Sequence, residues 1–401
     1  SDTDGDGVDD NTENAAGSNP KVADPEWWEG KYYVILPYDA EDHEIRPLDF
    51  STDITKADIL FLVDLSGSMD GEIANLKDGI NNTLIGSIKS KIPDAGFGIT
   101  TFEDFDSYPN DYGTRVIQTI TTNETTLKNT MSSVSALVGT GWEPQMSAIY
   151  FSVTGEARGT TPAMNCSTSE GSIGGACFRT GAMPIFIMMT DEAFETAYSK
   201  YKVGASDWIF VSTNDAINEL NSIKGKFIGV DSWNTGSFGV SPANDLKAVS
   251  NGTGSVDGVA DPFYYLINSN GTGLSTNVAA AVEYLAANVP MLVNTGKESI
   301  TNPQSVDVTQ FIKAITPVKR VVGGSTVNCP AECTAEAFQN VKPGTTVTFN
   351  IDFYNDFYPP VTSQATAFRA KINVFGEGSL VDTREVYIIV PGKAGGIGPG
   401  S

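Results

Sequence analysis

The stretch ADILFLVDLSGSM, residues 57–69, joins a largely apolar run to a polar cluster. The run is typical of a buried strand in a sheet that is covered on both faces. At its end, Asp64, Ser66 and Ser68 place one carboxylate and two hydroxyls at alternate positions. Such oxygens are hard ligands of the kind that Mg²⁺, Ca²⁺ and Mn²⁺ prefer. We therefore predict a cation site here, with helix N-capping by the serines as the alternative.

Around this stretch, strand-like apolar runs alternate with amphipathic segments between residues 56 and 292. The further strand candidates are residues 95–102, 184–191 and 225–233. The segments whose apolar residues recur at helical spacing are 71–92, 126–137, 143–153, 213–223 and 273–289. This alternation predicts an α/β domain with a doubly wound, mostly parallel sheet, Rossmann-like in its architecture.

A different pattern flanks the α/β region on both sides. Aromatic and β-branched residues with period-two stretches occur at residues 31–39, 345–355, 365–375 and 384–392. The first of these could not stand alone, because even an isolated hairpin is only marginally stable. We therefore predict one β-sandwich built from residues 25–55 and 293–395, into which the α/β domain of residues 56–292 is inserted.

Two more acidic residues belong with the first cluster. Ligands of open parallel sheets collect beyond the carboxyl ends of the strands. Asp191 ends the predicted strand at FIMMTD, and Glu143 lies in a loop that enters a helix at GWEPQMSAI. We expect both carboxylates at the same edge of the sheet as Asp64.

The motifs LFLVDLSGSM, GWEPQMSAI and FIMMTDEAF, in this order, resemble a von Willebrand factor type A domain with its metal-ion-dependent adhesion site. The resemblance implies a bound Mg²⁺ ion, or Mn²⁺ or Ca²⁺, that accepts a carboxylate from a protein or glycan partner. It implies that Ser66 and Ser68 are direct ligands and that Asp64 anchors their loop. Asp191 would bind directly or through water, and Glu143 would either coordinate the ion or be displaced by the incoming ligand.

Within this family the pattern is most similar to the I-like domain of integrin β subunits, which is inserted in a hybrid β-sandwich domain. Glu143 falls where that domain has a glutamate. The integrin pattern also implies an adjacent metal site, for which Asp70 and Glu72 are the candidates. A third integrin-like site is not expected, because residues 140–142 offer few ligands and Asp104 is a distant candidate.

The N-terminal residues DTDGDGVDDNTE have the spacing of a calcium-binding loop, with Gly7 at the turn position. The ligands would be Asp2, Asp4, Asp6, the carbonyl of Val8, Asp10 and Glu13. Together with the following AAGSNP, the segment resembles the thrombospondin type 3-like repeats of large secreted bacterial surface proteins. The resemblance implies that residues 1–20 bind Ca²⁺ and stiffen the chain. A disordered acidic tail is the alternative.

The four cysteines form two local pairs, Cys166 with Cys177 and Cys329 with Cys333. An even count at short spacings favours disulfides and an extracellular or cell-surface location, with free cytosolic thiols as the alternative. A zinc site fits less well, because C-x₂-C pairs are absent and His43 is the only histidine. The chain begins without a starter Met or a signal peptide, so we expect it to be part of a longer surface protein.

The formal net charge of −24 argues against nucleic acid and anionic membrane surfaces as partners. No apolar run is long enough to span a bilayer. We expect an adhesion module rather than an enzyme, because no Ser-His-Asp arrangement can be built around the ion and no cofactor loop is present. The alternatives are a structural assembly module of a surface filament and a metal-dependent hydrolase.

Overall fold

The computed structural model describes residues 1–5, 10–16, 19–23, 32–103, 113–137, 143–156, 163–164, 166, 173–194, 201–203, 207–209, 211–233, 240–257, 259–329 and 333–393. The chain divides into two compact units. One consists of Ser1–Asp53 together with Pro290–Ser401, and the other is the continuous segment Ile54–Val289.

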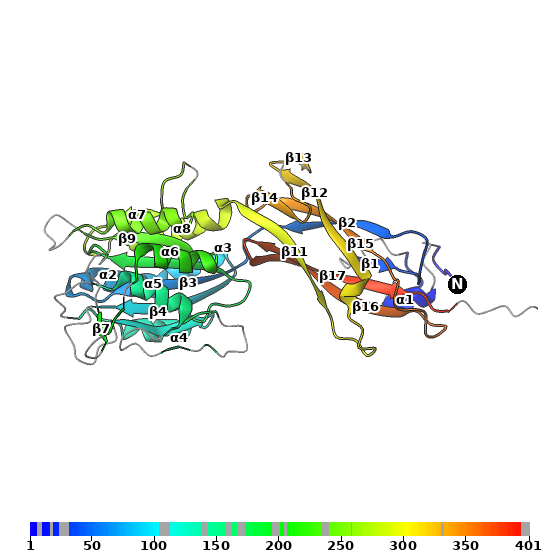
Figure 1. Cartoon of the computed structure of the whole chain (residues 1–401), viewed down its shortest axis with the longest axis horizontal. Helices are drawn as coiled ribbons and strands as arrows, with labels where there is room; N and C mark the ends of the chain where they lie inside the picture. Colours follow the sequence, from blue (N-terminus) through cyan, green and yellow to red (C-terminus); the bar gives the residue numbers. More distant parts are fainter. Residues whose placement is uncertain are drawn as a thin grey trace, which may run out of the picture. The chain divides into compact units, whose positions relative to one another are not determined.

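The Ile54–Val289 unit contains a six-stranded sheet in the order β10-β9-β6-β3-β4-β5 (Figure 1). Every neighbouring pair is parallel except β4 with β5, which is antiparallel. The strands are β3 (Lys56–Asp64), β4 (Asp94–Phe102), β5 (Thr114–Thr121), β6 (Met183–Thr190), β9 (Lys226–Asp231) and β10 (Tyr264–Leu266). A separate two-stranded sheet pairs β7 (Tyr201–Val203) with β8 (Asp207–Ile209).

Helices cover both faces of this sheet. On one face α6 contacts both α5 and α7. On the other face α2, α3 and α8 contact one another. The helices are α2 (Asp70–Asn82), α3 (Leu84–Lys91), α4 (Glu124–Ser132), α5 (Gln145–Thr154), α6 (Thr213–Ser222), α7 (Ala243–Gly252) and α8 (Leu274–Asn288). All residues of β3 after Lys56 are buried, as a central strand with two covered faces requires.

The segment predicted to be helical over residues 71–92 forms two helices, α2 and α3, and not one. They meet at Thr83, whose φ of −135° lies outside the helical range. Asn81, Asn82 and the β-branched Thr83 are three consecutive weak helix formers, which favours a break at this point. The segment predicted as helix over 126–137 is also shorter, since α4 ends at Ser132.

The other unit consists of two β-sheets, in the orders β1-β17-β16-β11-β14 and β13-β12-β15-β2. The strands are β1 (Tyr32–Ile35), β2 (Glu44–Ser51), β11 (Met291–Ser299), β12 (Ile312–Val322), β13 (Ser325–Asn328), β14 (Ala337–Val341), β15 (Thr346–Phe353), β16 (Thr366–Gly376) and β17 (Ser379–Val390). A short helix α1 (Asp10–Ala16) contacts β16 and β17, and a 3₁₀ turn, Val308–Phe311, precedes β12.

Strands from both ends of the chain build this unit. β1 pairs with β17, and β2 pairs with β15, so in Figure 1 blue strands lie among orange and red ones. Aromatic side chains join the two sheets, with the rings of Phe338 and Phe349 5.0 Å apart and those of Tyr32 and Phe353 6.2 Å apart. The predicted fold class, a mostly parallel α/β sheet combined with a β-sandwich, is confirmed.

Among the described residues, no helix is both long and apolar enough to cross a membrane.

Candidate metal centre

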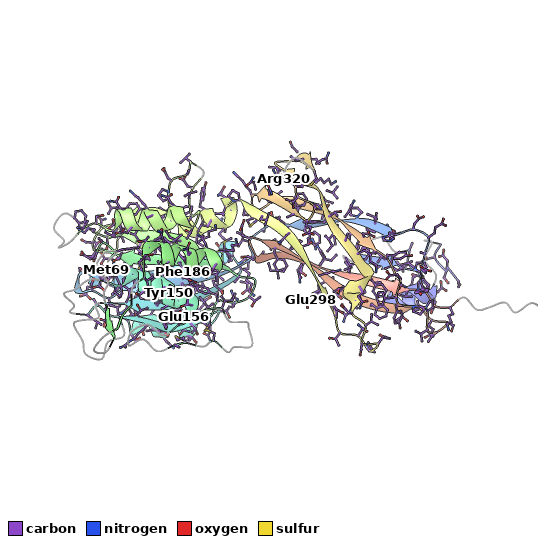
Figure 2. All side chains as sticks on the ribbon, in the orientation of Figure 1. Met69, Tyr150, Glu156, Phe186, Glu298 and Arg320 are labelled. Atoms are coloured by element: carbon purple, nitrogen blue, oxygen red, sulfur yellow. A yellow bond between two sulfur atoms is a disulfide. The ribbon has the colours of Figure 1, made fainter. Side chains whose placement is uncertain are left out.

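The serine loop begins where β3 ends. Asp64 is fully buried, and its Oδ1 accepts a hydrogen bond of 2.8 Å from the backbone N–H of Ser66. A 3₁₀ turn, Gly67–Met69, follows and leads into α2. Neither this turn nor α2 receives a side-chain N-cap bond, so the serine hydroxyls do not act as helix caps. Buried Met69, labelled in Figure 2, fixes the far side of the loop, where Ser232 Oγ lies 3.7 Å from its sulfur.

Three oxygen atoms converge at this point. Ser66 Oγ lies 3.2 Å from Ser68 Oγ, and Ser68 Oγ donates to Asp191 Oδ1 across 3.1 Å. Neighbouring ligands of an octahedral Mg²⁺ ion with bonds of about 2.1 Å are about 3 Å apart. The spacing of the three oxygens therefore fits adjacent positions in the shell of such an ion. Their chemistry, two hydroxyls and a carboxylate, fits a hard cation.

Thr190 is a part of the cluster that the sequence analysis did not identify. Its hydroxyl donates to Asp64 Oδ2 across 2.6 Å. The side chain of Gln145 lies behind it, with Nε2 3.4 Å from Thr190 Oγ1 and 3.2 Å from the carbonyl oxygen of Glu192. One feature of the sequence could have indicated this residue: Thr190 is a polar residue at the end of an otherwise apolar strand, directly before Asp191.

The carboxylates at this edge of the sheet repel one another. Burial is the main cause that raises the pKa of Asp64 to about 7, while bonds from Thr190 and Ser66 oppose it and the charge of Asp191 adds to it. Burial likewise raises the pKa of Asp191, and the charge of Asp231 acts in the same direction. A divalent cation would relieve this repulsion, because it supplies the opposite charge.

Asp231 ends the neighbouring strand β9 and accepts three hydrogen bonds from the protein's own donors. Its oxygens accept from Trp233 N at 2.7 Å, from Ser241 Oγ at 3.1 Å and from the hydroxyl of Tyr264 at 2.7 Å. We therefore assign Asp231 a structural role and an electrostatic effect on Asp191.

Glu143 is buried at the start of the segment that leads into α5. Its carbonyl oxygen accepts from Gln145 N across 3.1 Å, and the side chain of Gln145 contacts the end of β6. The role of Glu143 at the ion stays a prediction.

The structure does not bring Asp70 and Glu72 together as a pair. Asp70 is exposed, whereas Glu72 is 1% exposed and its Oε2 has no hydrogen-bond partner in the described part of the chain. Positions two residues apart on a helix do not face each other. Burial raises the pKa of Glu72 to about 7, Ser232 opposes this, and the charges of Asp191 and Asp64 add to it. Glu72 therefore belongs electrostatically to the main cluster.

Within the described part of the chain, no group of three or more His, Cys, Asp or Glu side chains is placed to hold a metal ion. An ion at the end of β3 would therefore depend on the hydroxyls of Ser66 and Ser68 as much as on Asp191.

The predicted calcium loop is described in part. Asp10 accepts from the backbone N–H and the hydroxyl of Thr3, at 2.8 and 2.7 Å, and Asp2 accepts from Gly5 N at 2.8 Å. Glu13 is buried, and Asp4 is half-buried. Three expected members of the loop, Asp6, Gly7 and Val8, lie outside the described residues. Asp104 and residues 140–142, which would belong to a third metal site, also lie outside them. Calcium binding stays a prediction.

Both cysteine pairs are disulfide-bonded, Cys166 with Cys177 and Cys329 with Cys333. His43 lies in the other unit from the serine loop, and its Nδ1 is 2.7 Å from Asp352 Oδ1.

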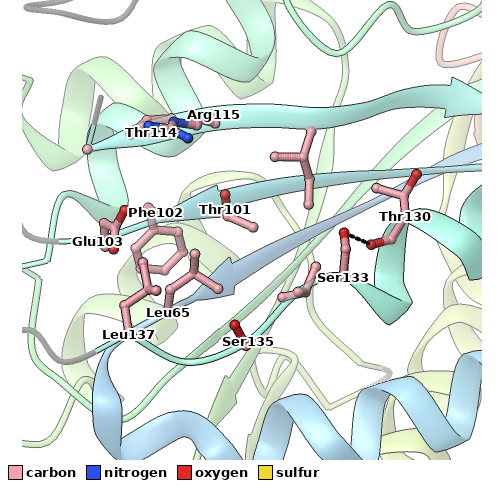
Figure 3. Close-up of a pocket in the computed structure, with 13 residues that line it drawn as sticks. Leu65, Thr101, Phe102, Glu103, Thr114, Arg115, Thr130, Ser133, Ser135 and Leu137 are labelled. Carbon is pink, nitrogen blue, oxygen red and sulfur yellow. Dashed lines mark hydrogen bonds between the residues drawn. The ribbon is translucent and has the colours of Figure 1, made fainter. Parts of the chain in front are cut away.

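A pocket of about 320 Å³ borders the serine loop (Figure 3). Leu65 and Leu137 form its wall beside the loop, where Leu137 N donates to Leu65 O across 2.7 Å. Phe102 adds an apolar surface, and Glu103 and Arg115 add charges. Ser66, Ser68 and Asp191 are not among its described lining residues, so the three converging oxygens do not open into this pocket.

The sequence matches no protein-family profile and no curated protein. Solved structures that resemble the chain include a von Willebrand factor type A protein from Catenulispora acidiphila, at 12% identity and a TM-score of 0.38, covering 90% of this chain and 72% of that one. The pilus adhesin SpaC from Lactobacillus rhamnosus GG is similar in an open conformation, at 11% identity and a TM-score of 0.37, and in a second form at 11% and 0.39. These matches cover 88% of this chain but only 45% and 46% of SpaC. Because each TM-score is below 0.5, the fold rests on the strand order described above and not on these likenesses.

Proposed function

We propose that the Ile54–Val289 unit is a metal-dependent adhesion module. It would hold one divalent cation, Mg²⁺ or else Mn²⁺ or Ca²⁺, at the end of β3 and present it to a carboxylate of a protein or glycan partner. The observation that carries the proposal is the convergence of Ser66 Oγ, Ser68 Oγ and Asp191 Oδ1 at spacings of 3.2 and 3.1 Å.

The side chains at this site have different roles, and together these roles suit the binding of an anionic partner. Ser66 and Ser68 offer neutral hydroxyls, so they neutralise none of the charge of a cation. Asp64 uses its oxygens on Ser66 N and Thr190, which makes it the anchor of the loop. When bound, the cation would supply the positive charge that attracts an acidic side chain. Asp191 accepts from the hydroxyl of Ser68 and would bind the cation directly or through water.

We propose a binding role rather than catalysis. The side chain of the single histidine, His43, is paired with Asp352, and no Ser-His-Asp order can be built around the serine loop. The two disulfides support an extracellular or cell-surface location, since such bonds persist in oxidising compartments. We expect this chain to work as one module of a longer surface protein.

The proposal is tested by binding of the purified protein to immobilised extracellular proteins and glycans, with Mg²⁺ and then with excess EDTA. Wild type should bind at least one surface with Mg²⁺ only, and Ser68→Ala should bind none. Asp70→Asn is the matched control, because Asp70 is exposed beside the loop and should be dispensable. A constitutive partner that survives EDTA would instead indicate a filament assembly module and would overturn metal-dependent adhesion.

A further inference from the structure

A chain of hydrogen bonds behind the serine loop joins three segments that are distant in sequence. Asp64 ends β3, Thr190 ends β6, and Gln145 begins α5. All three side chains are 0% exposed. Their contacts therefore lie inside the protein, where geometry is held by packing and hydrogen bonds are not exchanged with water.

The direction of the chain follows from the donors available. A hydroxyl has one hydrogen, and Thr190 Oγ1 is much closer to Asp64 Oδ2, at 2.6 Å, than to the carbonyl of Glu192, at 3.4 Å. Thr190 must therefore accept from Gln145 Nε2. The amide of Gln145 cannot be turned around, because its second contact is the carbonyl oxygen of Glu192, which only accepts.

The buried amide of Gln145 lowers the stability of the fold. Its Oε1 is buried and has no hydrogen-bond partner among the described residues. Leaving such an acceptor unsatisfied costs about 1–3 kcal/mol, so stability alone would favour an apolar residue of the same size. What the amide provides is a link: it contacts Thr190, which fixes Asp64, and it contacts the backbone carbonyl one residue beyond Asp191.

We infer that Thr190 and Gln145 are positioning residues of the cation site, which set the carboxylate of Asp64 and the Asp191 loop relative to each other. This inference rests on the proposed function. Asp64 in turn accepts a hydrogen bond from the backbone N–H of Ser66. A change at Thr190 that moves Asp64 should therefore also move the serine hydroxyls. Outer contacts of this kind typically change metal affinity by about 10- to 100-fold when removed.

The experiment titrates Mn²⁺ into the full chain by calorimetry and takes the signal that Ser68→Ala removes as binding to this site. Thr190→Val, which keeps the shape and lacks the donor, should weaken that binding about tenfold or more. Thr190→Ser keeps the donor and should bind within about twofold of wild type. Gln145→Met should also weaken binding, while its stability in EDTA should change little, because removal of the unsatisfied buried Oε1 offsets the loss of the two Nε2 bonds.

The outcomes separate the two claims. Wild-type affinity in both Thr190→Val and Gln145→Met would overturn the positioning role and leave the proposed function standing. If Thr190→Val does not fold, Gln145→Met together with the Thr190→Ser control decides the question. A wild-type protein that shows no Mn²⁺ signal dependent on Ser68 would overturn the proposed function and this inference with it.

Discussion

The hydroxyl of Ser68 donates to Oδ1 of Asp191 across 3.1 Å, although the two residues are 123 positions apart in the chain. This contact joins the loop after β3 to the end of the adjacent parallel strand β6. It forms because parallel strands deliver their carboxyl ends to one edge of the sheet. The cation site proposed above depends on this meeting of two strand ends.

Removing the charge of Asp191 should separate fold stability from cation binding. In EDTA, Asp191→Asn is expected to melt at or above the wild-type temperature, because burial and the charge of Asp231 already disfavour the ionised carboxylate. Mg²⁺ should raise the melting temperature of wild type by mass action and leave this variant unchanged. The exposed Asp70→Asn variant is the control and should respond to Mg²⁺ as wild type does. Equal Mg²⁺ shifts in wild type and Asp191→Asn would contradict the assignment.

The metal-free protein should lose stability as the pH rises from about 4 to about 7. The pKa of Asp64 is raised from 3.8 to about 7 in the folded state, mainly by burial, so over this window the native state binds more protons than the unfolded state. The free energy of unfolding in EDTA should therefore fall by a few kcal/mol and level off above pH 7. Urea unfolding of Asp64→Asn should show a shallower slope. An identical slope in the variant would mean that Asp64 does not control this dependence.

Much of this arrangement could be predicted from the sequence, for identifiable reasons. The apolar runs before Asp64 and Asp191 mark buried strands, and alternation with helical segments implies parallel strands with a shared edge. Thr190 was not predicted, because a threonine in a strand is ordinarily explained by its β-propensity. Gln145 was missed because a polar residue in the first turn of a helix usually faces solvent, whereas here it is buried. Both roles come from contacts between segments that are distant in the chain.

The start of α2 is packed tightly against the loop before α8. A Cβ on Gly71 would lie 2.7 Å from Asn270 Cα and 2.9 Å from Ser269 O, which are backbone atoms that cannot rotate away. Gly71→Ala should therefore destabilise the protein by about 1–3 kcal/mol.

Gly86→Ala is the matched control, since this exposed position on α3 has nothing within 4 Å of the added carbon. It should stabilise the protein by up to about 1 kcal/mol through helix propensity. Chemical unfolding measures both variants, and equal effects of the two substitutions would show that the close approach at Gly71 does not matter.

The opposite end of the sheet is held by a buried ion pair between Arg179 and Asp58. Arg179 N donates to Asp58 Oδ2 at 2.6 Å and Arg179 Nε to Oδ1 at 2.7 Å, while Nη1 reaches Asp94 at 2.6 Å. Arg179→Met would leave the fully buried Asp58 without its counter-charge and should cost about 3–5 kcal/mol. Asp58→Asn in that background should recover part of the loss in urea unfolding. No recovery would show that packing of the guanidinium, and not charge, is what matters.

Anomalous scattering from a crystal grown with Mn²⁺ would locate the divalent cation proposed between Ser66, Ser68 and Asp191. We expect an anomalous peak at the end of β3, about 2.1 Å from both serine hydroxyl oxygens and beside Asp191, that is absent from crystals of Ser68→Ala. Well-ordered density for residues 64–69 with no peak there, while Mn²⁺ is present elsewhere in the same crystal, would contradict it.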